Sequence, residues 1–570
     1  MTRITLPLFF LLFCFHILNA QTANRYDIII DEIFPDPSPV IGLPDAEFIE
    51  LKNISLTAYN LRNWQISDGS SIATVKKDFI LQPDSFVIIC STSAANDYVA
   101  FGATISVSGF PSLNNDGDII FLKSPEGLVI HAVDYNKSWY RNDIKSDGGW
   151  TIEMIDTKNP CTGFGNWKAS TDPRGGTPGQ KNAVDGINKD GLAPTLLRTY
   201  TIDSSTIVAV FDETVDSSNA SEVSNYMVDN NIGNPISVTV KQPLFNEVLL
   251  KLPVKLNADT VYHLTANNIT DCSGNVLDNN SAKAGLAVLA DTNDIIINEI
   301  LFNPQTNGYD YVEFYNRSNK VIDLKQLYVS TRDVTGVLKS ITALSPVPLL
   351  FFPGEYDVIT ENSLWVQQNY LVKNTDKLLQ LASLPSFPDD DGIVVLLNPN
   401  QTVIDELHYN HNWQLALITN EAGVALERIN YNKPTQNANN WTSAASTAGY
   451  GTPTYQNSEL NIDAQSKSEI NIIPKIFSPD DDGYEDYCFI NYQVPNPGFV
   501  ANITVYDASG RAVRNIANNA TLALNGTFKW DGLDNKQQRL PVGIYIIATQ
   551  IFDLNGKTKQ FKHAVTLARK

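Results

Sequence analysis

The chain is poor in the side chains from which catalytic sites are most often built. Its 570 residues include 6 histidines, 5 cysteines and 3 methionines. The histidines are scattered along the sequence, and the motifs H-E-x-x-H, G-x-S-x-G and C-x-x-C do not occur. His408 and His411 lie three residues apart in a strand-like segment, where such positions point to opposite faces, so a shared zinc ion is not expected. We therefore expect a protein that is not an enzyme.

Cysteine is also too scarce for a fold that depends on many disulfides. Four cysteines follow residue 20, namely Cys90, Cys161, Cys272 and Cys488. Cys90 and Cys161 fall in the same expected domain and could pair. We favour two buried thiols instead, because sequence spacing does not set the separation that a disulfide needs.

Long apolar runs are absent after the first twenty residues. Arg3 precedes an apolar segment from Leu6 to Leu18, which is typical of a secretory signal peptide and too short to span a membrane. Cys14 lies in this segment without the sequence context of a lipoprotein signal. We predict that residues 1–20 are a signal peptide, that the exported chain is soluble, and that no transmembrane segment follows.

Basic residues are outnumbered. The chain has 41 Lys and Arg against 62 Asp and Glu, a net charge of −21 and a pI of about 4.7. An acidic surface keeps an exported protein soluble and repels the phosphates of nucleic acids. We therefore exclude nucleic acid as a partner, and calcium is the cation that so many carboxylates favour.

The most informative feature that is present is a segment that occurs twice. Residues 27–53 read DIIIDEIFPDPSPVIGLPDAEFIELKN, and residues 294–316 read DIIINEILFNPQTNGYDYVEFYN. β-Branched runs bounded by Pro, Gly, Asn and Asp predict strands. Alternation around the second glutamate of each segment predicts one buried face and one wet face. We interpret the recurring glutamates as polar residues at strand edges rather than catalytic carboxylates: Glu32, Glu50, Glu299 and Glu313.

The similarity continues through each copy at a fixed offset. Trp139 and Trp413 are 274 residues apart, and so are Trp167 and Trp441. An offset of this length indicates a duplicated domain rather than a short solenoid repeat.

Both copies resemble the lamin tail domain. The shared hallmarks are an opening strand that ends in Asp/Asn-Glu-Ile, a strand with a central glutamate, an Asp-Gly hairpin and a closing N-W…G-T-P. The closing segment is GTPG at residues 176–179 and GTPT at residues 451–454, so the last glycine is missing in the second copy. The resemblance implies immunoglobulin-like β-sandwiches at residues 24–182 and 294–458, and it implies no chemistry.

Two features of these copies have competing interpretations. We expect Trp64, Trp150 and Trp167 in the core or on a packed sheet face, the alternative being a platform on which sugars stack. Residues 389–391 are three aspartates before a glycine at a hairpin tip. We favour a solvated turn there over a cation site.

The rest of the chain predicts two further β domains. Residues 191–290 are similar to bacterial Ig-like domains of S-layer and other surface proteins, through a VAVF strand and a DCSGN turn. Residues 470–570 resemble gliding-motility-type C-terminal domains and the Ig-like domain of the flagellar hook-capping protein. The resemblance is carried by FSPDDDGYED at residues 477–486 and by W-D-G…G-I-Y between Trp530 and Tyr545. It implies that the last domain serves type IX secretion or surface attachment.

The acidic opening of the last domain is the best metal candidate. Asp480, Asp482 and Asp486, with a main-chain carbonyl near Tyr484, could supply the oxygen ligands of calcium. An EF-hand is excluded because the loop glycine is at the fourth position and the twelfth position is Asn491. The alternative is an aspartate turn in contact with solvent.

The sequence as a whole predicts an all-β protein of four tandem Ig-like β-sandwich domains after a signal peptide. We expect a secreted or bacterial cell-surface protein with a structural or adhesive role. Its expected partners are a cell-surface or extracellular protein or polysaccharide, and the outer-membrane secretion machinery. The alternatives are an array of carbohydrate-binding modules and an accessory protein to a secreted nuclease or phosphatase.

Overall fold

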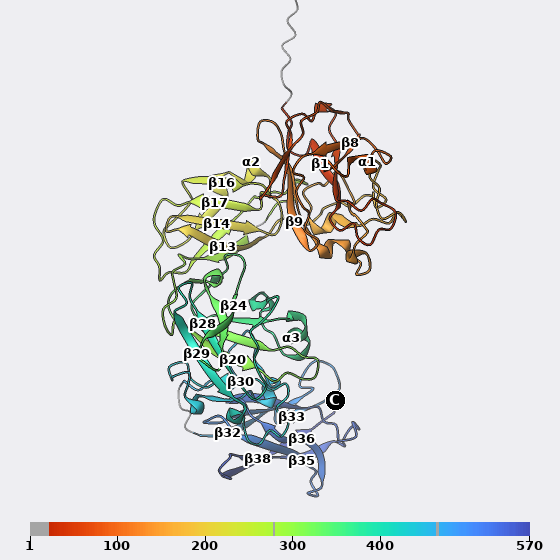
Figure 1. Cartoon of the computed structure of the whole chain (residues 1–570). Helices are drawn as coiled ribbons and strands as arrows, with labels where there is room; N and C mark the ends of the chain where they lie inside the picture. Colours follow the sequence, from red (N-terminus) through yellow and green to blue (C-terminus); the bar gives the residue numbers. More distant parts are fainter. Residues whose placement is uncertain (1–21, 278–279, 463–466, 570) are drawn as a thin grey trace, which may run out of the picture. The chain divides into compact units, whose positions relative to one another are not determined.

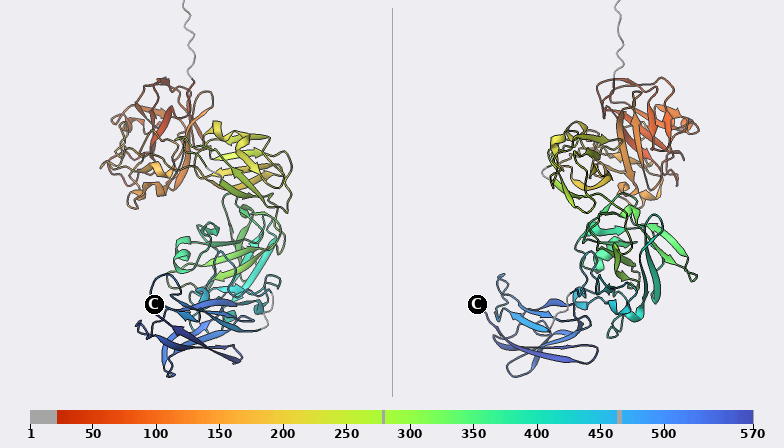
Figure 2. Two further views of the ribbon diagram at one scale, coloured as in Figure 1. Left: turned by 180° about the vertical axis from the view of Figure 1, so that it is seen from behind. Right: turned by 90° about the vertical axis from the view of Figure 1, so that its left-hand side faces the viewer.

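The computed structural model describes residues 22–277, 280–462 and 467–569, and its elements are almost all strands (Figures 1 and 2). The predicted signal peptide therefore lies outside the described residues. The described residues form two compact units. The N-terminal unit comprises the residues up to 254 with 263–283, and the C-terminal unit comprises 255–262 with the residues from 284 onward. The predicted all-β, Ig-like multi-domain fold is confirmed.

The first repeat packs a six-stranded sheet against a four-stranded sheet. The six-stranded order is β12 (Trp167–Ala169), β11 (Ile152–Met154), β1 (Ile28–Phe34), β2 (Phe48–Asn53), β7 (Phe86–Ser91) and β8 (Thr104–Val107). The four-stranded order is β10 (Val129–Asn136), β9 (Gly117–Lys123), β4 (Gln65–Ser67) and β5 (Ile72–Thr74). Strand β1 lies inside its sheet, with β2 on one side and β11 on the other.

The second repeat has the same topology. Its six-stranded order is β31 (Trp441–Ser443), β30 (Leu426–Arg428), β20 (Ile295–Leu301), β21 (Tyr311–Asn316), β26 (Tyr356–Thr360) and β27 (Leu378–Gln380). Its four-stranded order is β29 (Val403–Asn410), β28 (Asp391–Leu397), β23 (Tyr328–Arg332) and β24 (Leu338–Ala343). Even the single parallel pair recurs, between β7 and β8 and between β26 and β27. The duplication seen in the sequence is thus a duplication of architecture.

The predicted wet face of the strands around Glu50 and Glu313 is wrong. All six residues of β2 and five of the six residues of β21 are buried, as are all seven of β1 and of β20. On one face, Ile30 and Ile49 join the main core between the two sheets. On the other face, Phe34 and Phe48 join a second cluster with Tyr98 of the short helix α1 (Ala95–Tyr98). Successive side chains of these strands do point to two different faces of the sheet. The face away from the main core is buried too, because loops and helix α1 cover it.

The middle domain is also a two-sheet structure. One sheet has the order β13 (Leu196–Asp203), β14 (Thr206–Phe211), β17 (Glu247–Lys251) and β16 (Ser237–Lys241). The other has the order β15 (Tyr226–Val228), β18 (Tyr262–Ala266) and β19 (Asn280–Ala284). Within the N-terminal unit, Phe245 of this domain packs against Phe121 and Val129 of the first repeat. The guanidinium carbon of Arg25 lies 3.8 Å from the centre of the Phe245 ring.

The last domain shows the alternation of a sheet with one buried face. One sheet has the order β32 (Glu469–Ile473), β34 (Cys488–Gln493) and β37 (Asn525–Trp530). The other has the order β33 (Ile476–Phe477), β39 (Thr558–Leu567), β38 (Gly543–Phe552), β35 (Val500–Tyr506) and β36 (Ala512–Thr521). In β38, buried residues alternate with partly exposed ones from Tyr545 onward, because only one face of this sheet meets the core.

The cysteines pair differently from the pairing considered above. Cys161 bonds to Cys272 of the middle domain, with a Cα–Cα distance of 6.0 Å and 111 residues between them in sequence. Cys90 does not pair with Cys161 and is a buried free thiol, as is Cys488. Cys90 lies in strand β7 and packs in the cluster of Phe34 and Phe48, whereas Cys161 lies in the loop after β11. The disulfide therefore joins the two domains of the N-terminal unit.

This pairing predicts a measurable destabilisation on removal of the bond. The double variant Cys161→Ala/Cys272→Ala should lower the free energy of unfolding of the N-terminal unit by about 2–5 kcal/mol, since the bond closes a long loop in the unfolded chain. Urea unfolding with and without a reducing agent checks this. Alkylation of the denatured, unreduced mature protein should label Cys90 and Cys488 only. Labelling of Cys161 or Cys272 before reduction would contradict the pairing.

Candidate functional site

The three predicted calcium ligands come together in the loop between β33 and β34. One carboxylate oxygen of each of Asp480, Asp482 and Asp486 lies within 4.8 Å of the others. Asp486 is buried, and its Oδ1 accepts hydrogen bonds from the backbone N–H groups of Asp480 (3.2 Å) and Asp481 (2.7 Å). Its Oδ2 accepts a bond from Gly483 N at 2.9 Å. The Asp486 carboxylate thus shapes the turn and holds the two exposed aspartates beside it.

Two of the three aspartates have carboxylates that face solvent and could bind a hard cation. The exposed carboxylates of Asp480 and Asp482 offer the oxygen ligands that calcium prefers. Asp486 already accepts backbone hydrogen bonds with both oxygens, so it supports the turn whether or not an ion is bound. Calcium binding here stays a prediction.

Each lamin-tail-like repeat buries a row of three glutamates in its larger sheet. Glu32 of β1 stands opposite Glu50 of β2 on one side and Glu153 of β11 on the other. In the second repeat, Glu299 stands between Glu313 and Glu427 in the same way. Each of the six has a relative exposure of 0%. The interpretation of these glutamates as strand-edge residues is therefore wrong, because they occupy interior strands under a covering segment.

The covering segment in the first repeat is the closing G-T-P-G. The backbone N–H of Thr177 donates to Glu32 Oε1 at 2.8 Å, and the Thr177 hydroxyl donates to Glu153 Oε1 at 2.9 Å. The N–H of Gly179 donates to Glu50, and the N–H of Val184 donates to Glu153 Oε2 at 3.1 Å. The motif that closes the domain in sequence therefore supplies the hydrogen-bond donors that its buried acids need.

The second repeat uses its G-T-P-T segment in the same role. Thr452 N donates to Glu299 Oε1 at 3.0 Å, and Thr454 N donates to Glu313 Oε2 at 2.6 Å. The Thr452 hydroxyl lies 2.5 Å from Glu299 Oε2 and 2.8 Å from Glu427 Oε1. A hydroxyl carries one proton, so it cannot donate to two ionised carboxylates. Burial raises the pKa of Glu299 to about 8, which allows one of the two acids to carry the second proton.

The two rows differ at the residue where β1 and β20 bulge. In the second repeat, Asn298 Nδ2 donates to Glu313 Oε1 at 2.7 Å and to Asn457 Oδ1 at 2.6 Å. The first repeat has Asp31 at this place. Without that amide, several buried oxygens lack a hydrogen-bond partner: Asp31 Oδ1, Glu32 Oε2, Glu50 Oε1 and Asn182 Oδ1. Burial raises the pKa of Asp31 to about 7, which favours the protonated form of this buried acid.

The two glutamate rows hold the fold together, because they bind the closing segment of each domain to its larger sheet. Their side chains are closed to solvent, and N–H and O–H groups of the closing segments hydrogen-bond to them. His131 has a similar role, because its Nδ1 accepts a bond from Ile30 N at 2.8 Å and its Nε2 lies 3.0 Å from Pro160 O. Burial lowers the pKa of His131 to about 4, so the ring is neutral.

Other candidates are dispersed. His408 lies near Glu406 and His411 near Glu421, each at 3.4 Å, so the two imidazoles have separate partners. The acids of residues 389–391 do not form a converging ligand group among the described residues, unlike Asp190, Glu213 and Asp271 of the N-terminal unit.

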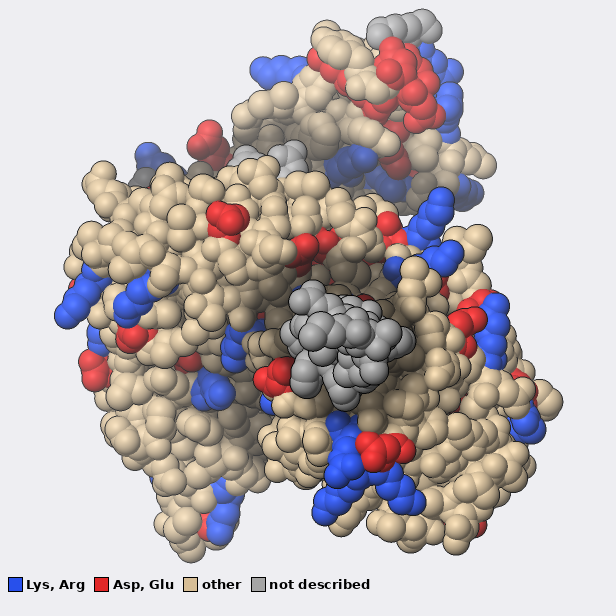
Figure 3. All heavy atoms as spheres, turned by 90° about the horizontal axis from the view of Figure 1, so that it is seen from above, with Lys and Arg blue, Asp and Glu red and all other residues tan. Residues whose placement is uncertain are grey.

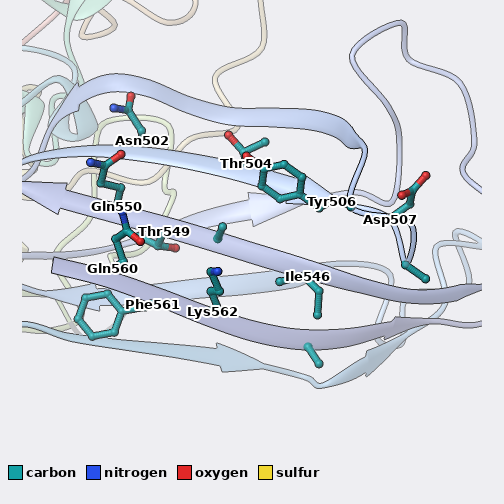
Figure 4. Close-up of a pocket in the computed structure, with 14 residues that line it drawn as sticks. Asn502, Thr504, Tyr506, Asp507, Ile546, Thr549, Gln550, Gln560, Phe561 and Lys562 are labelled. Atoms are coloured by element: carbon teal, nitrogen blue, oxygen red, sulfur yellow. The ribbon is translucent and has the colours of Figure 1, made fainter.

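A trough of about 770 Å³ lies on the last domain. It is lined by strands β35, β38 and β39, with Asn502, Thr504, Gln550 and Gln560 on its surface (Figure 4). Two of the lining residues carry a formal charge, Asp507 and Lys562. Asp507 forms an ion pair with Arg511. On the face shown in Figure 3, basic and acidic side chains are interspersed. These surfaces show no converging set of catalytic groups within the described part of the chain.

Comparison with known families identifies three of the domains. Residues 21–137 and 289–411 match the family model of the Lamin Tail Domain, and residues 471–567 match that of the CHU_C Type IX secretion signal domain. The chain contains two lamin tail domains and a type IX secretion signal domain. The signal domain indicates a secreted or cell-surface protein and implies an interaction with the secretion machinery. These families are structural and secretion-signal types rather than catalytic ones.

Among solved structures the similarities are distant. The N-terminal part of the bacterial S-layer protein SbsC is 16% identical with a TM-score of 0.16, over 30% of this chain and 41% of that one. FlgD from P. aeruginosa is 20% identical with a TM-score of 0.13, over 18% of this chain and 69% of that one. A Ca²⁺-stabilised adhesin of an Antarctic bacterium is 8% identical with a TM-score of 0.12, over 97% and 100%. Similarities at these TM-scores carry no functional inference, and no curated protein matches the chain.

Among the described residues, no helix combines the length and the apolar character that a membrane crossing needs.

The difference between Asp31 and Asn298 predicts opposite effects of reciprocal substitutions. At pH 8, Asp31→Asn should stabilise the N-terminal unit by about 1–3 kcal/mol, because the amide supplies donors to buried oxygens. Asn298→Asp should destabilise the C-terminal unit by a similar amount. Urea unfolding of each variant measures both.

The pH dependence follows from the raised pKa of Asp31. A carboxyl that is easier to protonate when folded stabilises the fold at low pH, and this contribution is lost as pH rises through about 7. Asp31→Asn should therefore flatten the decline of stability that runs from about pH 4 to about pH 7, between the ordinary pKa of 3.8 and the raised one. Asp143→Asn, at an exposed position of the same unit, is the control. It should change neither the free energy of unfolding at pH 8 nor its slope with pH. An unchanged slope in Asp31→Asn would refute the assignment.

Proposed function

We propose that this chain is a non-catalytic structural or adhesive protein of the bacterial cell surface. The observation that carries the proposal is the combination of small β-sandwiches with a terminal type IX secretion signal domain. The ionisable groups that recur in both lamin tail domains are buried and engaged in holding the fold. Contact with partners is then left to loops and sheet faces, where binding residues of β-sandwich proteins usually lie.

Two features of the chain support a load-bearing role. The disulfide between Cys161 and Cys272 joins neighbouring domains of the N-terminal unit covalently. In the C-terminal unit, the second lamin tail domain hydrogen-bonds directly to the signal domain: Ser446 N donates to Thr521 Oγ1 at 2.7 Å, and Ala523 N donates to Thr447 Oγ1 at 3.0 Å. Such contacts restrict rotation between neighbouring modules. Restricted rotation helps an adhesive protein hold its domains at a fixed distance from the cell surface.

An array of carbohydrate-binding modules is the less favoured alternative. Such an array displays aromatic rings in a row on a wet face. Here most tryptophans are buried, namely Trp64, Trp139, Trp167, Trp441 and Trp530, and only Trp150, Trp365 and Trp413 are partly exposed. No described domain therefore presents a tryptophan platform.

The signal domain predicts the outcome of truncation. A chain that lacks residues 470–570 should accumulate in the periplasm, because the secretion machinery has lost the domain that it recognises. Cell fractionation and surface labelling of intact cells measure the distribution. A chain that lacks residues 24–182 is the matched control and should still reach the outside. Surface display of the truncated chain at the level of the full chain would refute the export role.

We also propose that the Asp480 loop binds calcium. About 5 mM calcium, above the roughly 0.1–1 mM dissociation constants of extracellular calcium modules, should raise the melting temperature of the C-terminal unit by a few degrees. Asp480→Ala and Asp482→Ala should abolish the rise. Asp390→Ala, in the acidic hairpin tip of the second lamin tail domain, is the control and should retain it. Differential scanning calorimetry of the mature chain measures the shift, and a rise that persists in Asp480→Ala would exclude the site.

A further inference from the structure

A small pocket in the second lamin tail domain has the chemistry of a sugar site. It has a volume of about 250 Å³ and lies between helix α3 (Ser363–Asn369), the loop after β20, the loop before β30, and Gly449–Tyr450. Three aromatic side chains line it: Trp365, Tyr370 and Tyr450. Three carboxamides also line it: Gln305, Asn369 and Asn420. Its lining contains no residue with a formal charge.

Several polar atoms of this pocket have no partner within the described protein. The amide of Gln305, the indole N–H of Trp365 and the hydroxyl of Tyr450 make no hydrogen bond there. Asn369 uses its Nδ2 to bond Trp365 O at 2.8 Å, which leaves its Oδ1 free. Asn420 accepts a long 3.3 Å bond from Ala422 N with Oδ1, which leaves its Nδ2 free. Tyr370 differs, because its hydroxyl donates to Gly423 O at 2.9 Å and its ring is 8% exposed, so it forms the floor.

We propose that this pocket binds one residue of a neutral saccharide. Aromatic faces pack against the C–H faces of a sugar ring, and carboxamides offer a donor and an acceptor to neighbouring hydroxyls. The absence of charge in the lining disfavours phosphate, metal ions and charged peptides, which need a counter-charge when they lose water. The volume lies just below the roughly 300–1,000 Å³ of pockets for drug-sized ligands, which suits a single ring of a longer chain.

The first lamin tail domain shows that the fold does not require this pocket. Its loop between β1 and β2, residues 35–47, is longer than residues 302–310 in the second domain. In the first domain Ile41 of this loop fills the corresponding space, since a Cβ added to Gly149 would lie 2.9 Å from Ile41 Cδ1. In the second domain the equivalent Gly423 faces the amide-bearing side chain of Gln305 instead. The helix of the first domain, α1, carries no tryptophan.

Tyr450 adds an independent argument. Its φ is +66°, a left-handed conformation that is unfavourable for a side chain with a Cβ. The first domain has Gly175 at this place, with φ +97°. The carbonyl of Gly175 accepts a hydrogen bond from Thr151 N, as that of Tyr450 does from Ala425 N. A glycine would thus relieve strain in the second domain. What Tyr450 contributes that a glycine would not is its side chain, which lies at the rim of the pocket. The residue is 38% exposed.

The substitution Tyr450→Gly therefore separates binding from folding. It should keep or raise the melting temperature, because it removes backbone strain, and it should weaken saccharide binding by about tenfold through loss of one ring. Trp365→Ala should weaken binding at least as much. Leu364→Ala is the matched control, since Leu364 lies beside Trp365 on α3, is 61% exposed and does not line the pocket.

The test uses the mature full-length chain and a panel of neutral hexasaccharides of glucose, mannose, xylose and N-acetylglucosamine. Tryptophan fluorescence and calorimetric titration up to about 5 mM cover weak affinities. Binding that is lost in Tyr450→Gly and Trp365→Ala but kept in Leu364→Ala supports the proposal. No binding of any of these saccharides by the wild type, or equal binding by Tyr450→Gly, overturns it. The proposal gives the adhesive role a ligand class, and it can fail in this assay while the export experiment in cells succeeds.

Discussion

The lamin tail domains depend on the hydrogen bonds that a loop at the end of each domain donates to a row of buried glutamates. Three carboxylates side by side in a sheet interior would repel one another and lose their water. The threonine of G-T-P and the backbone N–H groups around it replace that water in both copies. This interaction links the first strand to a segment about 150 residues later, so it forms only when the whole domain is assembled.

The same requirement explains how the two copies diverged. Asn298 completes the network in the second copy with two amide donors, whereas Asp31 leaves oxygens without partners in the first. Away from the network, the loops are free to change. A longer loop with Ile41 fills the space beside Gly149 and Gly175 in one copy, and a shorter loop leaves a pocket lined by aromatic rings and amides in the other. The constrained interior and the variable rim are thus physically separate.

The signal domain is built on a different principle. Its long strands alternate buried and partly exposed residues, and one face of its larger sheet is covered only by solvent. A lamin tail sheet is covered on both faces, by the partner sheet and by loops, so its opening strand is buried along its whole length in each copy. The signal domain thus leaves one face of its larger sheet open, whereas each lamin tail domain covers both faces of its larger sheet.

Much of this protein was determined by local sequence. β-Branched runs, turn residues and the 274-residue offset were sufficient for an all-β chain with a duplicated domain, because strand periodicity and turn chemistry act over a few residues. The clustering of Asp480, Asp482 and Asp486 also followed from their proximity in sequence. Only the tertiary structure decided the burial of the glutamates, the pairing of Cys161 with Cys272, and the pocket of Trp365 and Tyr450. Each depends on segments far apart in the chain, and alternation alone does not say what covers the second face of a sheet.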